Sequence, residues 1–281
     1  MWIVVAMLAG MSFATSLQLT GMLTKGHDFR KFLMAAGMTS LISLPFLPMV
    51  HADPVSVGLS LGAGCLLGLT DIPFYMSFRH LSALTISIAG QTMPVFVLIS
   101  GWLILGKEMS FNHMISFVLI LSGSLLAALR KDGGKDSTKG VLLFFACISI
   151  ASLFHVANSY VTNDRHISGL QVAILNRAGM LIACVLMLAT RFRRGMLELF
   201  KTREQSKFYR NNMFSVVFLG LVVLSVSLKP AELNPSIVNI VYYGTCQVCL
   251  FAYSLAKKEP VGRKAIGAVM AFAGLIWLAA Q

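Results

Sequence analysis

Charged side chains are scarce in this sequence. Aspartate, glutamate, lysine and arginine together make up 12% of the 281 residues, about half the fraction found in a soluble globular chain. Hydrophobic residues make up 57%, and a single water-soluble core cannot enclose that much apolar surface, so lipid must cover much of it. The composition therefore excludes an ordinary soluble domain and predicts an integral membrane protein.

Acidic residues are the scarcer of the two charge classes. The chain has 11 Asp and Glu against 23 Lys and Arg, a net charge of +12 at pH 7. An excess of this sign can indicate nucleic-acid binding, but the basic residues here lie in short loops between apolar runs, which is the positive-inside pattern of membrane proteins. We therefore expect no nucleic-acid partner.

Cysteine and catalytic motifs are also sparse. The five cysteines all lie in apolar segments, so we expect them to pack as small hydrophobic residues rather than form disulfides. Cys246 and Cys249 have CxxC spacing, but no second Cys or His pair accompanies them, which argues against a metal or redox site. The sequence has no HExxH, GxSxG or P-loop motif. We expect neither an enzyme nor a bound cofactor, and any transport must draw its energy from a gradient or a separate partner.

Long apolar runs are what the chain has in abundance. A lipid-spanning helix needs roughly 20 apolar residues, and such runs recur along the chain without the alternation of barrel strands. Backbone groups in lipid must be hydrogen-bonded within their own segment, which makes each run a helix. We predict an all-α polytopic membrane protein with ten transmembrane helices. The predicted spans are Ile3–Leu23, Phe32–Val50, Val57–Phe78, Leu84–Leu105, His113–Leu129, Val141–Val161, Leu170–Thr190, Asn212–Leu228, Leu233–Leu255 and Ala265–Ala280.

Lysine and arginine are distributed unevenly between the loops. Loops after odd-numbered spans hold 19 of them, loops after even-numbered spans hold 3, and Arg177 lies inside a span. Because cytoplasmic loops carry the excess of basic residues, the odd-numbered loops are predicted to be cytoplasmic. Both termini then lie outside, in a multi-pass protein of the cell membrane.

The two halves of the chain share a pattern. Lys107-Glu108 ends the fourth span and Lys258-Glu259 ends the ninth, 151 residues later, and the same offset relates Gly123 to Gly274. We predict a first five-helix repeat over residues 1–130, a basic cytoplasmic linker over 131–140 and a second repeat over 141–281. Five crossings are an odd number, so the second repeat is inverted in the membrane. Inverted repeats are typical of secondary transporters, whose substrate site lies near the midplane between the repeats.

Short motifs in the first half resemble a known family. Pro94-Val95-Phe96, the run from Leu103 to Glu108, and Leu121-Ser122-Gly123 resemble the EamA-type repeat of the drug/metabolite transporter superfamily, and the second half repeats the pattern less clearly. The resemblance implies ten helices, two inverted five-helix repeats and export or exchange of a solute. The family often has an arginine early in the second helix of a repeat, a place that Arg177 fits, whereas the first repeat is apolar there.

Polar side chains inside the predicted spans are the candidates for substrate binding, because they are costly in lipid. Asp71 is the only acidic residue deep in a span, in a segment that Pro73 breaks. It is predicted to carry a proton or to face a cationic substrate; alternatively it pairs with Arg177, which could instead hold an anionic substrate group. The eight predicted substrate-binding residues are Asp71, Gln91, His155, Asn158, Arg177, Tyr242, Tyr243 and Gln247.

The other six candidates each have a packing alternative. His155 and Asn158 are three residues apart and so share a helix face, although a lone membrane histidine is often a packing residue. Gln91 and Gln247 can bond between helices. Tyr242 and Tyr243 lie mid-span, where they suit an aromatic solute or simply pack. We also expect close helix contacts at Gly58 and Gly62 and at Gly64 and Gly68, which have small-xxx-small spacing.

These patterns together favour a secondary transporter, an exporter or exchanger of a small organic solute working by alternating access at a midplane cavity. The expected partners are the small-molecule substrate, membrane lipid and protons as the coupling ion. A membrane-embedded enzyme and a channel-like or sensor protein are the alternatives. The fifth and tenth spans have few polar groups, so we expect them to lie at the periphery.

Overall fold

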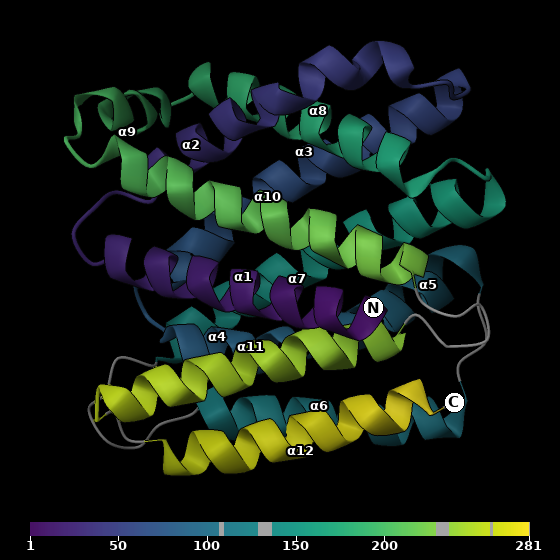
Figure 1. The fold of residues 1–281 in the computed structure, drawn as a ribbon, viewed down its shortest axis with the longest axis vertical. Coiled ribbons are helices and arrows are strands. Elements are labelled where there is room, and N and C mark those ends of the chain that lie inside the picture. Colours follow the sequence, from purple (N-terminus) through teal and green to yellow (C-terminus); the bar gives the residue numbers. More distant parts are fainter. Residues whose placement is uncertain (107–109, 129–136, 229–235, 259–260, 281) are drawn as a thin grey trace.

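The computed structural model describes residues 1–281 except 107–109, 129–136, 229–235, 259–260 and 281. Every regular element in the described residues is a helix (Figure 1). The first half contains α1 (Trp2–Leu23), α2 (Arg30–Ser40), η1 (Leu41–Met49), α3 (Pro54–Ser77), α4 (Ala83–Gly90), α5 (Met93–Leu105) and α6 (Phe111–Ala128). The second half contains α7 (Thr138–Ser159), η2 (Tyr160–Asp164), α8 (Gly169–Leu188), α9 (Arg193–Leu197), η3 (Glu198–Lys201), α10 (Gln205–Leu228), α11 (Ser236–Ala256) and α12 (Gly262–Ala279).

The prediction of a polytopic helical membrane protein is confirmed. Within the described residues, seven helical stretches are long and apolar enough to cross a membrane: Trp2–Leu23, Arg30–Met49, Pro54–Ser77, Ala83–Leu105, Phe111–Ala128, Thr138–Asp164 and Gly169–Leu188. A shorter apolar stretch covers Ile240–Ala256. A helix lies at each of the ten predicted positions, while the count of ten membrane crossings stays a prediction. The start of α1 and the end of α12 lie toward the same side of the molecule in Figure 1.

Three predicted spans are interrupted in the structure. The second changes from α-helix to the 3₁₀-helix η1, which contains Pro45 and Pro48. The fourth breaks at Gln91 and Thr92, between α4 and α5. Pro94 explains this break, because it has no backbone N–H and its ring clashes with the carbonyl four residues earlier, at Gly90. The sixth ends in a π-helical turn, η2. Such breaks are tolerated at membrane depth where protein surrounds them.

The helix contacts recur in matching pairs. α1 packs against α10 and α11, while α3 packs against α7 and α8. In terms of the predicted spans, α3 and α7 are the third and sixth, and α10 and α1 are the eighth and first. Shifting each span by five positions therefore converts the α3–α7 contact into the α10–α1 contact. α6 and α12 pack against each other and lie together at the lower end of Figure 1, as expected for the fifth and tenth spans.

The two glycines of the sequence pattern lie in the interface of α6 and α12. A Cβ at Gly123 would approach Gly267, Met270 and Ala271, and a Cβ at Gly274 would approach Ser116, Leu119 and Ile120. Each residue of the first set is 151 positions after one of the second, so the offset seen in the sequence also relates the contacts. Glu108 and Glu259, the acidic members of the pattern, lie outside the described residues.

Glycines also determine how closely α3 approaches α8. A Cβ at Gly64 would lie 2.1 Å from the carbonyl oxygen of Asn176, and one at Gly179 would lie 2.2 Å from that of Leu61. Only hydrogen at these positions allows the backbones to meet. Gly58 and Gly62 have no described atom within 4 Å of such a Cβ, so the first of the two predicted glycine pairs makes no close helix contact.

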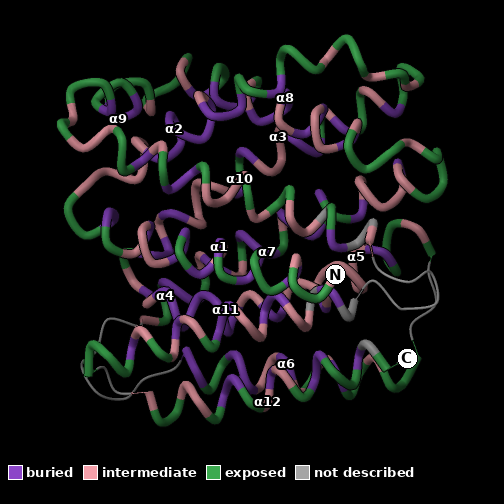
Figure 2. Tube along the Cα trace, viewed as in Figure 1, coloured by how far each residue is buried: buried purple, intermediate pink, exposed green. Residues whose placement is uncertain are grey.

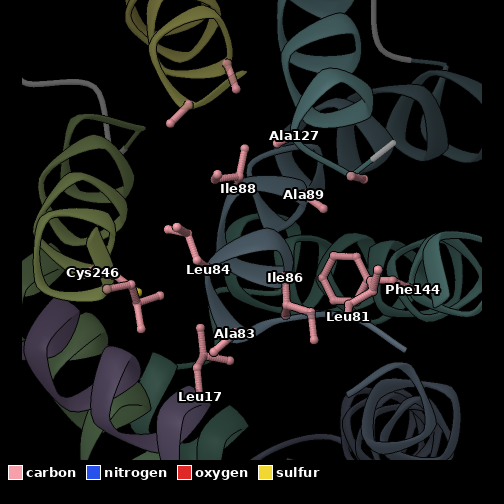
Figure 3. Packing of buried hydrophobic residues seen from close by; sticks show 14 of the residues in the cluster. Leu17, Leu81, Ala83, Leu84, Ile86, Ile88, Ala89, Ala127, Phe144 and Cys246 are labelled. Carbon is pink, nitrogen blue, oxygen red and sulfur yellow. The ribbon is translucent and has the colours of Figure 1, made fainter. Parts of the chain in front are cut away.

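The core surrounds α4. Every residue from Ala83 to Ala89 is buried, and Leu84, Ile86 and Ile88 pack against Leu17 of α1 and Phe144 of α7 in one cluster (Figure 3). Exposed residues follow the outward faces of the helices and their ends (Figure 2). Many of these exposed residues are large and apolar, such as Leu103 and Val269 at 68% and 69% exposure, as expected for a surface that lipid covers.

Candidate functional site

Asp71 lies on α3 where that helix faces α7 and α8. Its carboxylate interacts electrostatically with the Arg177 guanidinium of α8, with Cys147 of α7 and with Tyr75, one turn further along α3. The two opposite charges do not reach ion-pair distance, and no described residue donates a hydrogen bond to the carboxylate. The structure thus places Asp71 and Arg177 near each other. They do not form the ion pair that the sequence allowed as an alternative.

Arg177 is also incompletely bonded. Its Nη1 contacts the Met180 sulfur at 3.5 Å, and its Nη2 is buried without a hydrogen-bond partner among the described residues. The neighbouring Asn176 donates from Nδ2 to Asn158 Oδ1 at 3.2 Å, which ties α8 to α7, but Asn176 Oδ1 has no described partner.

A buried polar group left without a partner costs about 1–3 kcal/mol, and more when it is charged. A carboxylate, a guanidinium and an amide oxygen on α3 and α8 all have open hydrogen-bonding capacity. A polar solute or water that bonds to them would recover this energy. The arrangement can therefore hold a small molecule carrying a positive group, a negative group, or both.

Gln91 lies at the break between α4 and α5. Its side chain is fully buried, and neither amide atom has a described partner. The adjacent Gly90 faces the ring of Tyr243 on α11, because a Cβ there would lie 3.7 Å from Tyr243 Cε1. The broken fourth span thus places a second unsatisfied amide in the protein interior.

The tyrosines are packed against other aromatic rings. The Tyr242 and Tyr243 ring centroids are 4.4 Å apart, and Phe218 of α10 and Phe13 of α1 complete the cluster, with centroid distances of 5.3 Å from Phe218 to Tyr242 and 6.4 Å from Phe13 to Tyr243. This cluster joins α11 to α1 and α10. Both tyrosines are buried, as the packing alternative predicts, and Tyr243 is the one beside the α4 break.

His155 and Gln247 lie apart from the charged residues. His155 is exposed and makes an edge contact with the Phe154 ring, with centroids 5.1 Å apart, while Asn158 bonds to Asn176. Gln247 lines an apolar groove between α11 and α12. The eight predicted residues therefore form no single cluster. Asp71 and Arg177 lie near each other without contact, and Asn158 bonds to Asn176, the neighbour of Arg177. Tyr242 and Tyr243 pack together beside the break that holds Gln91, and His155 and Gln247 lie apart.

Tyr75, Cys147 and Asn176 lie at this site but are not among the residues predicted from the sequence. Tyr75 follows Asp71 by four residues and so shares its helix face, a signal the spacing contains. Asn176 precedes Arg177, but Cys147 could be found only from the packing of α7 on α3. A further polar seam joins α1 to α10, where Ser16 bonds to Ser215 at 2.8 Å and Asn211 donates to Thr20 at 2.9 Å.

A cavity of about 520 Å³ opens at the ends of α1 and α3. Lys25, His27, Phe78 and Arg79 are among the residues that line it, and His27 Nε2 lies 2.8 Å from Glu204 Oε2, before α10. Hydrogen bonds from Lys207 and then from His27 hold the pKa of Glu204 below its usual value. Arg79 is eight residues from Asp71, or about 12 Å along α3, so the cavity lies at the helix end nearest the charged site.

In the described part of the chain no three His, Cys, Asp or Glu side chains come together to hold a metal ion. The polar groups in the interior instead include a carboxylate, a guanidinium and an amide, those of Asp71, Arg177 and Gln91. Groups of this kind suit an organic solute.

Comparison with known proteins connects this arrangement to a family. Residues 1–129 match the model of the EamA-like transporter family. A protein of Archaeoglobus fulgidus described as an "uncharacterized transporter" is 26% identical over 211 residues, covering 72% of this chain and 71% of the relative. One solved crystal structure has a similar fold, with a TM-score of 0.54 and 13% identity over 99% of this chain and 97% of that one. The family match over residues 1–129 and the similarity to a transporter support an EamA-type membrane transporter.

Proposed function

We propose that the protein is a secondary transporter that exports or exchanges a small organic solute by alternating access. The proposal rests on the open charge pair. Asp71 and Arg177 lie on facing helices within electrostatic reach, no described residue bonds to the Asp71 carboxylate, and Arg177 Nη2 has no described partner. A solute bridging them would replace the missing contacts. Asp71 is also the residue we propose to exchange a proton during the cycle, because it is an acidic group deep in a described span.

An inverted repeat would support this mechanism. If residues 1–130 and 141–281 are related by a rotation of about 180° about an axis in the membrane plane, each contact between repeats should have a mate. The paired packing of α1 on α10 and α3 on α7, and the related surroundings of Gly123 and Gly274, agree with that expectation. Rocking of one repeat against the other would then expose the site between α3, α7 and α8 to each side in turn.

We place the basic helix ends in the cytoplasm and both termini outside, in the cell membrane. The cavity beside Lys25 and Arg79 then becomes the cytoplasmic approach to the site. Cysteine labelling or an experimental structure that gives residues 1–130 and 141–281 the same orientation in the membrane would contradict this arrangement.

The test is solute counterflow in liposomes containing the purified protein. Labelled leucine, tetraethylammonium and succinate represent a zwitterion, a cation and an anion. We expect uptake of at least one class into liposomes preloaded with the same unlabelled solute, and loss of that uptake in Asp71→Asn or Arg177→Gln. Asp164→Asn, which removes an exposed carboxylate outside the proposed site, is the matched control and should retain uptake. Counterflow that both site variants leave unchanged contradicts the assignment of the site.

A further inference from the structure

An apolar groove of about 740 Å³ runs between α11 and α12, beside Met7 of α1. Small residues such as Gly244 and Ala268 form part of its lining, and Val248, Val269 and Ile276 at its rim are 69%, 69% and 50% exposed. The groove therefore opens on the surface that lipid covers, and its volume lies in the range of small-molecule sites.

Thr245 and Gln247 are the polar residues among the described groove lining. The Thr245 hydroxyl donates to the Val241 carbonyl oxygen at 2.8 Å, whereas Gln247 has no such bond. Its side chain is 5% exposed, its Nε2 is buried without a partner, and no described residue bonds to the amide. A primary amide in an apolar membrane groove is costly unless something bonds to it. A packing role alone would be served better by leucine or methionine, so the amide points to a ligand with a hydrogen-bonding group.

The depth of Gln247 restricts the ligand. It lies eleven residues after Ser236 and nine before Ala256, the ends of α11, so it is about 14–16 Å from either end at ~1.5 Å per residue. The ester groups of an ordinary glycerolipid lie at the bilayer interface and would not reach it. None of the described residues that line the groove is charged, and an unpaired charge there would be strongly disfavoured.

We propose that the groove between α11 and α12 binds an uncharged, largely apolar molecule that enters from the bilayer and presents one carbonyl or hydroxyl group to the Gln247 amide. The site is separate from Asp71 and Arg177, and the proposal does not depend on the transport mechanism.

The experiment is photolabelling of the full chain in lipid nanodiscs with two probes, a twelve-carbon methyl ketone bearing a diazirine and the matching hydrocarbon bearing the same diazirine. Mass spectrometry of the peptides locates the adducts. We expect the ketone to label α11 and α12 saturably, with competition by unlabelled dodecan-2-one, and the hydrocarbon to label weakly. Gln247→Leu should weaken ketone binding by roughly five-fold, the loss of one hydrogen bond.

Two further variants make the result decisive. Gln18→Leu, which removes a glutamine of α1 that does not line the groove, should label like the wild type. Ala273→Phe fills the groove from an exposed position and should abolish ketone labelling even if Gln247→Leu fails to fold. Labelling spread over all lipid-facing helices, or ketone labelling unchanged in Gln247→Leu or in Ala273→Phe, overturns the proposal.

Discussion

Replacing Gly64 with alanine tests how the α3–α8 contact supports the charged site. The new Cβ would lie 2.1 Å from the Asn176 carbonyl oxygen, against 3.4 Å or more for an ordinary contact. The atom in the way is backbone, which cannot rotate aside, so the helices must separate by more than an ångström. Overpacking of this kind costs about 1–3 kcal/mol. The movement would also carry Asn176 and Arg177 away from Asp71.

Gly62→Ala is the matched control, on the same helix half a turn away. A Cβ there meets no described atom within 4 Å. The alanine therefore causes no overpacking and only raises the helix propensity of α3, by up to about 1 kcal/mol. The free energy of unfolding is measured by SDS titration in mixed micelles, followed by circular dichroism. We expect Gly64→Ala to be less stable than Gly62→Ala by about 1–3 kcal/mol. Equal stability of the two variants would refute the close-packing argument.

Three further predictions concern charge. Asp71→Asn should fold normally but lose proton-driven transport; if it instead lowers the amount of folded protein and adding Arg177→Gln restores it, the two residues form a structural pair. A cysteine at Arg203 should react with an impermeant reagent only from the cytoplasm and one at Asp164 only from outside, and the reverse labelling rejects the topology. Hydrogen bonds from the Ser56 side chain and from backbone N–H groups hold the pKa of Asp53 below its usual 3.8. The stability lost in Asp53→Ala should therefore be constant above about pH 4–5 and shrink as the pH falls below 3.8; thermal unfolding across this range checks it, and a difference that grows on acidification contradicts it.

Hydropathy located the helices because lipid leaves the backbone no other way to satisfy its polar groups. The Pro94 break was not predicted, although the proline was visible, since a proline in a membrane helix can kink it or end it depending on what surrounds the freed groups. The match of Gly123 and Gly274 pointed to equivalent positions in two repeats, and the structure places both in one interface.

The sequence by itself determined that the chain is a helical membrane protein of the transporter type and that Asp71 and Arg177 are exceptional, because charge in an apolar run is costly wherever the run packs. Only the tertiary structure decided which polar groups meet. It placed Arg177 near Asp71 without a contact pair, and it left Gln247 facing a groove. These outcomes depend on how far the glycines of α3 and α8 let the backbones approach and on which face each helix turns inward, and neither property is local to the residues concerned.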